Sequence, residues 1–132
     1  MIVRLICQEE WRLVAICNSA HETFLDELAL TAKAEAGLLA ALNRLAMLGP
    51  DSFNSELLHW VHKDPKIFQL SKGKIRALWF YADDSTMVLC NAFVKKTQKT
   101  PPGVIESALR FFDAYQDAKT AGSVTLIRDE ED

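Results

Sequence analysis

The sequence predicts a single α+β domain in which N-terminal strands and a helical hairpin pack on a twisted antiparallel sheet, with a further helix near the C-terminus. Its 132 residues, 49% of them apolar, have the length and composition of one ordinary domain. Apolar residues recur at helical spacing between residues 24 and 48, and β-rich segments joined by short turns fill residues 66–94. We therefore expect residues 1–132 to form one domain, with residues 118–132 as a C-terminal extension.

The N-terminal residues predict strands followed by a helix. Residues 2–7 and 11–16 are apolar and β-branched on either side of a polar Gln-Glu-Glu, so they form either a hairpin or one long bent strand. Ser19 and Glu22 have the spacing of a capping box, which predicts that the first helix begins there.

A second helix is expected over roughly residues 33–48, antiparallel to the first and joined to it near Thr31. Gly49 and the proline after it end this helix. Residues 52–62 predict a short third helix, which Pro65 breaks. The second helix is expected to present a stripe of four leucines: Leu38, Leu42, Leu45 and Leu48.

The middle of the chain predicts an antiparallel meander. Residues 66–71 and 74–81 are joined by Lys-Gly, a tight-turn signal, and residues 87–94 follow a polar Asp-Asp-Ser turn. Residues 95–102 are polar, carry two prolines and predict a loop. A final helix then begins at Pro102-Gly103, and residues 124–127 form either an edge strand or a frayed tail.

The charged residues are distributed unevenly along the chain. The net charge is −3, which alone argues against a nucleic-acid-binding protein. Residues 63–99, however, hold eight basic and three acidic side chains, a net charge of +5 between two segments of −4 each. A basic segment of this kind can create a local positive field on a protein whose net charge is negative. The alternative is that these lysines are solvated on a sheet edge, where they prevent edge pairing.

Cysteine usage and hydropathy indicate a cytoplasmic protein. Cys7, Cys17 and Cys90 form no C-x-x-C pair and lie among apolar neighbours, so we expect buried reduced thiols rather than disulfides or a zinc site. No apolar run approaches the roughly 18 residues of a membrane helix, and the N-terminus does not have the pattern of a signal peptide. We expect no membrane association.

Other candidate residues have structural explanations that are simpler than functional ones. His59 and His62 would share one face of the expected short helix, but without further ligands nearby they are interpreted as solvated rather than metal-binding. Tyr81 is interpreted as facing the core. The carboxylates are scattered, and neither a phosphate-binding glycine loop nor a nucleophile elbow is present. We expect no metal and no cofactor.

The most specific string lies at residues 91–101, which read Asn-Ala-Phe-Val-Lys-Lys-Thr-Gln-Lys-Thr-Pro. With the preceding meander it resembles toxins of the HigB/RelE type, and more closely their phage-derived HigB-like branch. In that branch a core strand runs into a Phe-x-Lys-Lys-Thr-x-Lys-Thr-Pro loop, and the next helix carries Ala and Arg, here Ala108 and Arg110. The resemblance spans roughly residues 20–117 and implies a RelE-like fold.

The resemblance implies the toxin of a type II toxin–antitoxin pair, a ribosome-dependent endoribonuclease that cleaves translated mRNA and is restrained by a helix-turn-helix antitoxin. In the chemistry of this family, which needs no metal, a 2′-hydroxyl attacks its own 3′-phosphate. That reaction needs a base, an acid and cations that stabilise the transition state. The resemblance leaves the oligomeric state open, and a homodimer is one possibility.

Three basic residues match positions that carry the family's chemistry. Arg76 matches a strand arginine and is expected to bind the scissile phosphate, because a guanidinium is always charged and can bind two oxygens. Lys72 and Lys74 fall in the turn where related toxins place basic residues. A lysine there can act as a base only where burial or neighbouring cations lower its pKa from about 10.4.

Two positions depart from the family pattern, whereas the loop over residues 95–102 matches it. Ser71 replaces a strand arginine, and Asn91 stands where many relatives carry a histidine. Asparagine can hydrogen-bond a phosphate but cannot exchange a proton near neutral pH. The loop is expected to bind the backbone of mRNA or ribosomal RNA through four residues: Lys95, Lys96, Gln98 and Lys99.

Two alternatives to the nuclease stay open. One is a non-catalytic interaction protein on the same scaffold, either a phage accessory protein or a binder of a target such as DNA gyrase, as the ParE toxins are. Ser71 and Asn91 favour that alternative, whereas the intact Phe-Val-Lys-Lys-Thr string favours the nuclease. The other is an RNA-binding protein with a basic patch and no antitoxin.

Overall fold

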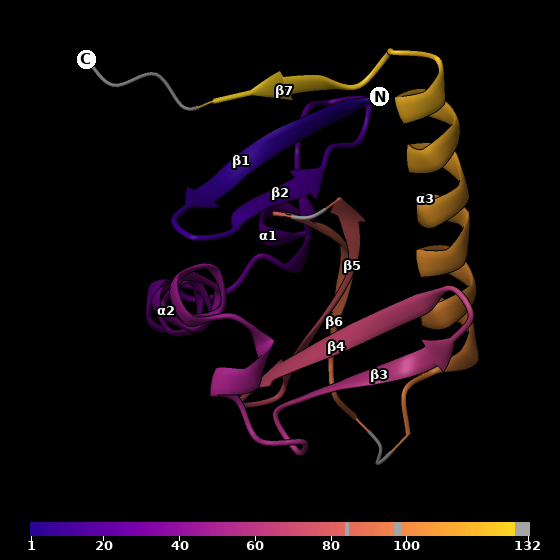
Figure 1. The fold of residues 1–132 in the computed structure, drawn as a ribbon. Helices are drawn as coiled ribbons and strands as arrows, with labels where there is room; N and C mark the ends of the chain where they lie inside the picture. The colour runs from indigo at the N-terminus through magenta and orange to yellow at the C-terminus, as the bar shows by residue number, and fades with distance from the viewer. Residues whose placement is uncertain (84, 97–98, 129–132) are drawn as a thin grey trace.

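The computed structural model describes residues 1–83, 85–96 and 99–128, and within them the chain forms one sheet with helices on both faces (Figure 1). In chain order the elements are β1 (Ile2–Gln8), β2 (Arg12–Ile16), α1 (Phe24–Leu28), α2 (Ala32–Leu48), the short 3-10 helix η1 (Pro50–Ser52), β3 (Leu58–Lys63), β4 (Lys66–Lys72), β5 (Ile75–Asp83), β6 (Thr86–Val94), α3 (Pro102–Thr120) and β7 (Thr125–Ile127). The predicted α+β class is confirmed.

The sheet is mixed rather than wholly antiparallel. Its strand order is β3-β4-β5-β6-β2-β1-β7. The pairs β4–β5 and β5–β6 form the predicted antiparallel meander, and β3 adds an antiparallel strand that was not predicted. The strands β1 and β2 form a hairpin, which is one of the two predicted alternatives. Two parallel pairings, β2 with β6 and β1 with β7, join the terminal strands to the sheet. Parallel strands need long crossover connections, which the helices supply here.

The first helix begins at a different cap from the one predicted. Asn18 Oδ1 accepts hydrogen bonds from the backbone N–H groups of Ala20 and Glu22, so the segment with Ser19 is a turn. Thr23 is the true N-cap of α1 and forms a capping box with Asp26. The predicted second helix is confirmed as α2, which has Thr31 as its N-cap.

The expected helix over residues 52–62 is wrong. Asn54 Oδ1 accepts from the backbone N–H groups of Glu56 and Leu57, which makes a turn there. The chain then continues as β3, and Leu58 pairs with Leu70 of β4. Pairing with β4 and burial of Leu58 therefore outweigh a weak helical pattern.

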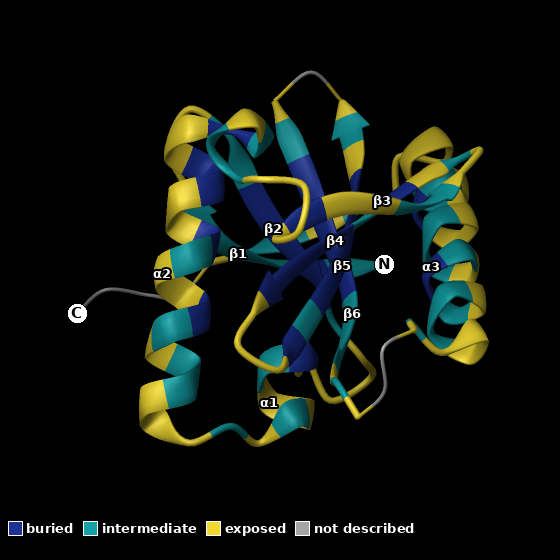
Figure 2. Cartoon of the chain, turned by 90° about the horizontal axis from the view of Figure 1, so that it is seen from below, coloured by how far each residue is buried: buried dark blue, intermediate teal, exposed yellow. Residues whose placement is uncertain are grey.

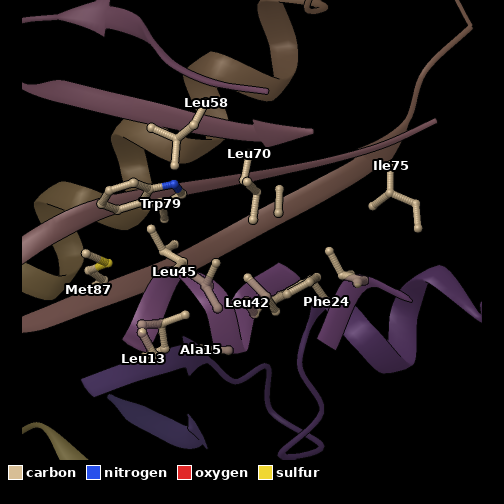
Figure 3. Packing of buried hydrophobic residues seen from close by; sticks show 14 residues of the cluster. Leu13, Ala15, Phe24, Leu42, Leu45, Leu58, Leu70, Ile75, Trp79 and Met87 are labelled. Carbon is tan, nitrogen blue, oxygen red and sulfur yellow. The ribbon is translucent and has the colours of Figure 1, made fainter. Parts of the chain in front are cut away.

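The two faces of the sheet carry separate hydrophobic cores. Under α2, Leu42 and Leu45 are 0% exposed and belong to the same core cluster as Trp79 of β5, and Figure 3 shows Leu45 near Trp79. Under α3, Ala108 and Tyr115 pack against residues of β4, β5 and β6. Figure 2 shows the central strands buried, while exposed residues lie on the outer sides of both helices. Alternation along each strand decides which core a side chain joins.

Two of the expected core residues are exposed. Leu38 continues the buried stripe of α2, but Leu48 is 65% exposed at the C-terminal end of the helix. Tyr81 is 37% exposed, and its ring contacts the rings of Trp11 and Phe68 at centroid distances of 5.5 and 5.4 Å. Its predicted place in the core is therefore wrong, because the ring lies at the margin of the aromatic cluster.

Of the two alternatives predicted for residues 124–127, the structure shows the edge strand, which is β7. After α3 the chain turns at Gly122, whose φ is +68°, and Thr125 N donates to Met1 O at 2.8 Å. β7 then pairs in parallel with β1. Among the residues that the structure describes, no helix is long and apolar enough to cross a membrane.

Candidate functional site

Most of the predicted basic residues gather at one end of the sheet, around the β4–β5 turn and the end of β6. The strand register divides this end into two faces. Ser71 pairs with Arg76, which pairs with Phe93, and these three side chains lie on the face of the sheet that α3 covers. One position along, Ile75 pairs with both Lys72 and Val94 on its two neighbouring strands. The side chains of these three residues therefore lie on the opposite face of the sheet, under α2.

A cavity of about 190 Å³ opens on the α3 face, and we call it the Arg76 cavity. It brings together residues from β3, β4, β5 and the segment after β6. Glu56 supplies the one carboxylate among the lining residues that the structure describes. The cationic and polar residues that line it are His59, Gln69, Arg76, Lys95, Lys99 and Thr100.

Arg76 is held by the turn that precedes it. Its Nη1 donates to the carbonyl oxygens of Gly73 at 2.7 Å and Ile75 at 3.0 Å. Gly73 has a φ of +58°, a conformation that other residues adopt at a cost. Both hydrogen bonds use Nη1, so they fix the guanidinium group and leave its other nitrogens for an anion in the cavity.

A partly buried hydrogen bond ties the loop after β6 to the sheet. Gln69 of β4 is 5% exposed, and its Oε1 accepts from Thr100 Oγ1 at 2.8 Å. At the start of the loop, Lys95 N donates to Lys74 O at 2.6 Å. These two bonds anchor both ends of the segment that brings Lys95 and Lys99 to the cavity.

His59 lines the same cavity and is exposed, so the predicted solvated histidine is also part of the cavity wall. In the incorrectly expected helix it shares a face with His62, whereas in β3 it pairs with Gln69. Its Nδ1 lies 2.9 Å from Ser55 O. A carbonyl oxygen only accepts, so Nδ1 carries the hydrogen, and Nε2 is the ring nitrogen left to accept a proton. Residues 57–62 read Leu-Leu-His-Trp-Val-His, which has no alternation of period two, so no local pattern in the sequence signals this strand.

Lys72 and Lys74 line a different cavity, which we call the α2 groove. It has a volume of about 690 Å³ and lies between the N-terminal turns of α2, the β4–β5 turn and the end of β6. A Cβ atom placed on Gly37 would lie 3.4 Å from Lys72 Cε, so the lysine stem lies close against the helix. The structure therefore does not bring Lys72 and Lys74 into the cavity that holds Arg76.

Asn91 also lies outside the Arg76 cavity. Its Nδ2 donates to Val104 O at 3.1 Å, which fastens the first turn of α3 to β6. It lines a third cavity, of about 380 Å³, together with Cys17 and Cys90. Burial raises the pKa of the Cys90 thiol to about 12, so this group is a neutral packing residue near neutral pH.

The remaining predicted residues are placed as follows. Lys96 is exposed just beyond β6, and Gln98 lies outside the described residues, as do residues 129–132 of the predicted C-terminal extension. The three cysteines are free, but only Cys90 is fully buried, whereas Cys7 and Cys17 are half-buried. Within the described part of the chain, no group of three or more His, Cys, Asp or Glu residues is placed to hold a metal ion.

Comparison with known proteins finds one family for this chain. The model for the family described as phage derived protein Gp49-like (DUF891) matches residues 24–113. The match runs from α1 into α3 and includes every residue that lines the Arg76 cavity. No curated protein matches the chain.

Proposed function

Because this chain belongs to the Gp49-like family of phage-derived proteins, a RelE/HigB-like toxin family of toxin–antitoxin systems, we propose that it is a toxin that cleaves messenger RNA on the ribosome. In this proposal its partners are the ribosome, the translated mRNA and a helix-turn-helix antitoxin that restrains it. The protein acts in the cytoplasm, where translation takes place.

One observation carries the proposal: Arg76, Lys95, Lys99 and a histidine with a defined tautomer line the same small cavity. A bent ribonucleotide linkage presents a phosphate to the cations and a 2′-hydroxyl to the base. Clustered cations in a partly enclosed site stabilise developing negative charge far better than the same charges in water.

The residues of the cavity divide the reaction between them. Nε2 of His59 takes the proton of the 2′-hydroxyl, whose oxygen attacks phosphorus. Arg76 neutralises the non-bridging oxygens. The ammonium group of Lys95 or Lys99 donates a proton to the departing 5′-oxygen, which leaves as a hydroxyl. The products are a 2′,3′-cyclic phosphate and a free 5′-hydroxyl. Asn91 has no part in this scheme, because its amide holds Val104 O.

Induced expression in bacterial cells tests the proposal. We expect translation to stop and mRNA ends to appear inside ribosome-bound reading frames, and the double variant His59→Gln, Arg76→Ala to abolish both effects. Arrested growth with intact mRNA would contradict the nuclease. So would unchanged cleavage by the double variant, provided that circular dichroism shows it to be folded.

A non-catalytic interaction protein is the second candidate. The observation that favours it is Ser71, which pairs with Arg76 on the same face and supplies no second guanidinium there. In that case the protein halts growth or binds its target without producing cut mRNA ends, so the same experiment separates the two candidates.

A further inference from the structure

The α2 groove, with a volume of about 690 Å³, is a concave surface to which no role has been assigned, and its floor is apolar. Leu30 and Ala34 come from the entry to α2, and Ile75 and Val94 come from the ends of β5 and β6. Val94 is 42% exposed, although Ile75, its partner in the strand register, is only 7% exposed. An apolar side chain left open in a groove of this size is typical of a surface that a partner covers.

The rim of the groove is positively charged. Lys33, Lys72 and Lys74 line it, and no acidic residue is among its lining residues in the described part of the chain. The first turn of α2, which begins after the N-cap Thr31, adds the positive end of a helix dipole. On a protein with a net charge of −3, this local field selects an acidic ligand.

The lining favours a peptide over a nucleic acid. No aromatic ring lines the described groove, whereas single-stranded RNA is bound largely by base stacking on such rings. Aliphatic side chains flanked by carboxylates complement an apolar floor flanked by lysines. A helix presents side chains in this way, with an apolar stripe along one face and acidic residues on both sides of it.

We propose that the α2 groove is a docking site for an acidic amphipathic helix of a partner protein. The aliphatic face of that helix covers Ile75 and Val94, and its carboxylates pair with the three lysines. The site lies on the opposite face of the sheet from the Arg76 cavity, so a docked helix leaves the cavity open. The inference does not depend on whether the cavity cleaves RNA.

Fluorescence anisotropy with the full-length protein tests the site. The probe is a labelled synthetic helix with leucines at i, i+3, i+4 and i+7 and glutamates at the flanking positions. We expect saturable binding that the double variant Lys72→Glu, Lys74→Glu weakens at least about tenfold. Val94→Asp places a carboxylate on the floor and is expected to weaken binding by a similar factor.

A matched control separates specific docking from general attraction. The double variant Lys63→Glu, Lys66→Glu makes the same charge change at the β3–β4 turn, where both residues are exposed and distant from the groove in the strand register. It is expected to change binding less than about threefold, since exposed charges beyond a Debye length are screened. Equal loss in both double variants would overturn the proposal.

Backbone amide NMR locates the probe. We expect shifts at Gly37, Ile75 and Val94, little change at His59, and no displacement of the probe by a short single-stranded RNA. Shifts that centre on His59 and Arg76 would overturn the proposal. Displacement of the probe by the RNA would also overturn it and would assign the groove lysines to nucleic-acid binding. The absence of saturable binding would equally reject it, while leaving the nuclease proposal untouched.

Discussion

The Arg76 cavity and the α2 groove occupy the same end of the sheet but differ in chemistry. The cavity is small and polar and combines a guanidinium, lysines and a histidine. The groove is larger and has an apolar floor with lysines on its rim. The two cavities lie on opposite faces of the sheet, because Ile75 and Arg76 are consecutive residues of β5 and their side chains point to opposite faces. Basic residues that are close in sequence therefore serve two surfaces.

Replacing His59 is expected to have the largest effect on cleavage. His59→Gln removes the proposed base and should slow cleavage about 1000-fold, within the range of general acid–base catalysis. The matched control is His62→Gln on the same strand, whose Nδ1 lies 2.8 Å from Pro65 O outside the cavity. Single-turnover cleavage of mRNA on purified ribosomes measures both. Equal rates for the two variants would remove His59 from the mechanism.

Arg76→Ala should slow cleavage about 100-fold, as expected for loss of one charged group that stabilises the transition state. Lys72→Ala, on the other face, is expected to change the rate less than about threefold. The same ribosome assay compares them, with circular dichroism to check folding. If Lys72→Ala is as damaging as Arg76→Ala, the division into two surfaces is wrong.

The buried Cys90 predicts a pH dependence of stability. Burial raises its pKa from 9.0 to about 12, so above pH 9 the unfolded chain releases this proton while the folded chain retains it. The free energy of unfolding should then fall with rising pH, by up to about 1.4 kcal/mol per unit. Urea unfolding at pH 8 and pH 10 measures the change. Cys90→Ala should flatten this part of the profile, and an unaltered profile would contradict the assignment.

Asn91→Ala is expected to have the smallest effect. Loss of the hydrogen bond to Val104 O should lower the free energy of unfolding by about 1 kcal/mol. Cleavage should stay within about twofold of the wild-type rate, because Asn91 lies outside the Arg76 cavity. Urea unfolding and the ribosome assay together test this structural role. A large loss of activity with unchanged stability would return Asn91 to the site.

The fold was predictable where a pattern repeats over many residues. The helix α2 and the meander of β4, β5 and β6 have long, regular patterns, so their types and order follow from the sequence. β3 was not predictable in this way, because residues 52–62 satisfy a weak helical spacing while pairing with β4 decides the outcome. The parallel pairings of β2 and β7 depend on tertiary contacts that no local pattern contains.

The site was predictable in part. Arg76 and Lys95 lie together in one cavity, as the charge cluster and the family resemblance suggested. His59 was missed because its role depends on β3 being a strand. Lys72 and Lys74 were grouped with Arg76 because the family resemblance places basic residues in this turn. Neither the resemblance nor the charge count contains information about which face of the sheet a residue occupies. Their roles in RNA cleavage stay predictions.

The most direct test of the division between the two faces is NMR mapping with an oligonucleotide that cannot be cleaved because it lacks the attacking 2′-hydroxyl. The account predicts shifts of the Arg76 guanidinium Nε–H, the His59 ring and the Thr100 amide, with Gly37 and Val94 unchanged. Shifts confined to Gly37, Lys72 and Val94 would contradict it, since the nucleic acid would then occupy the α2 groove.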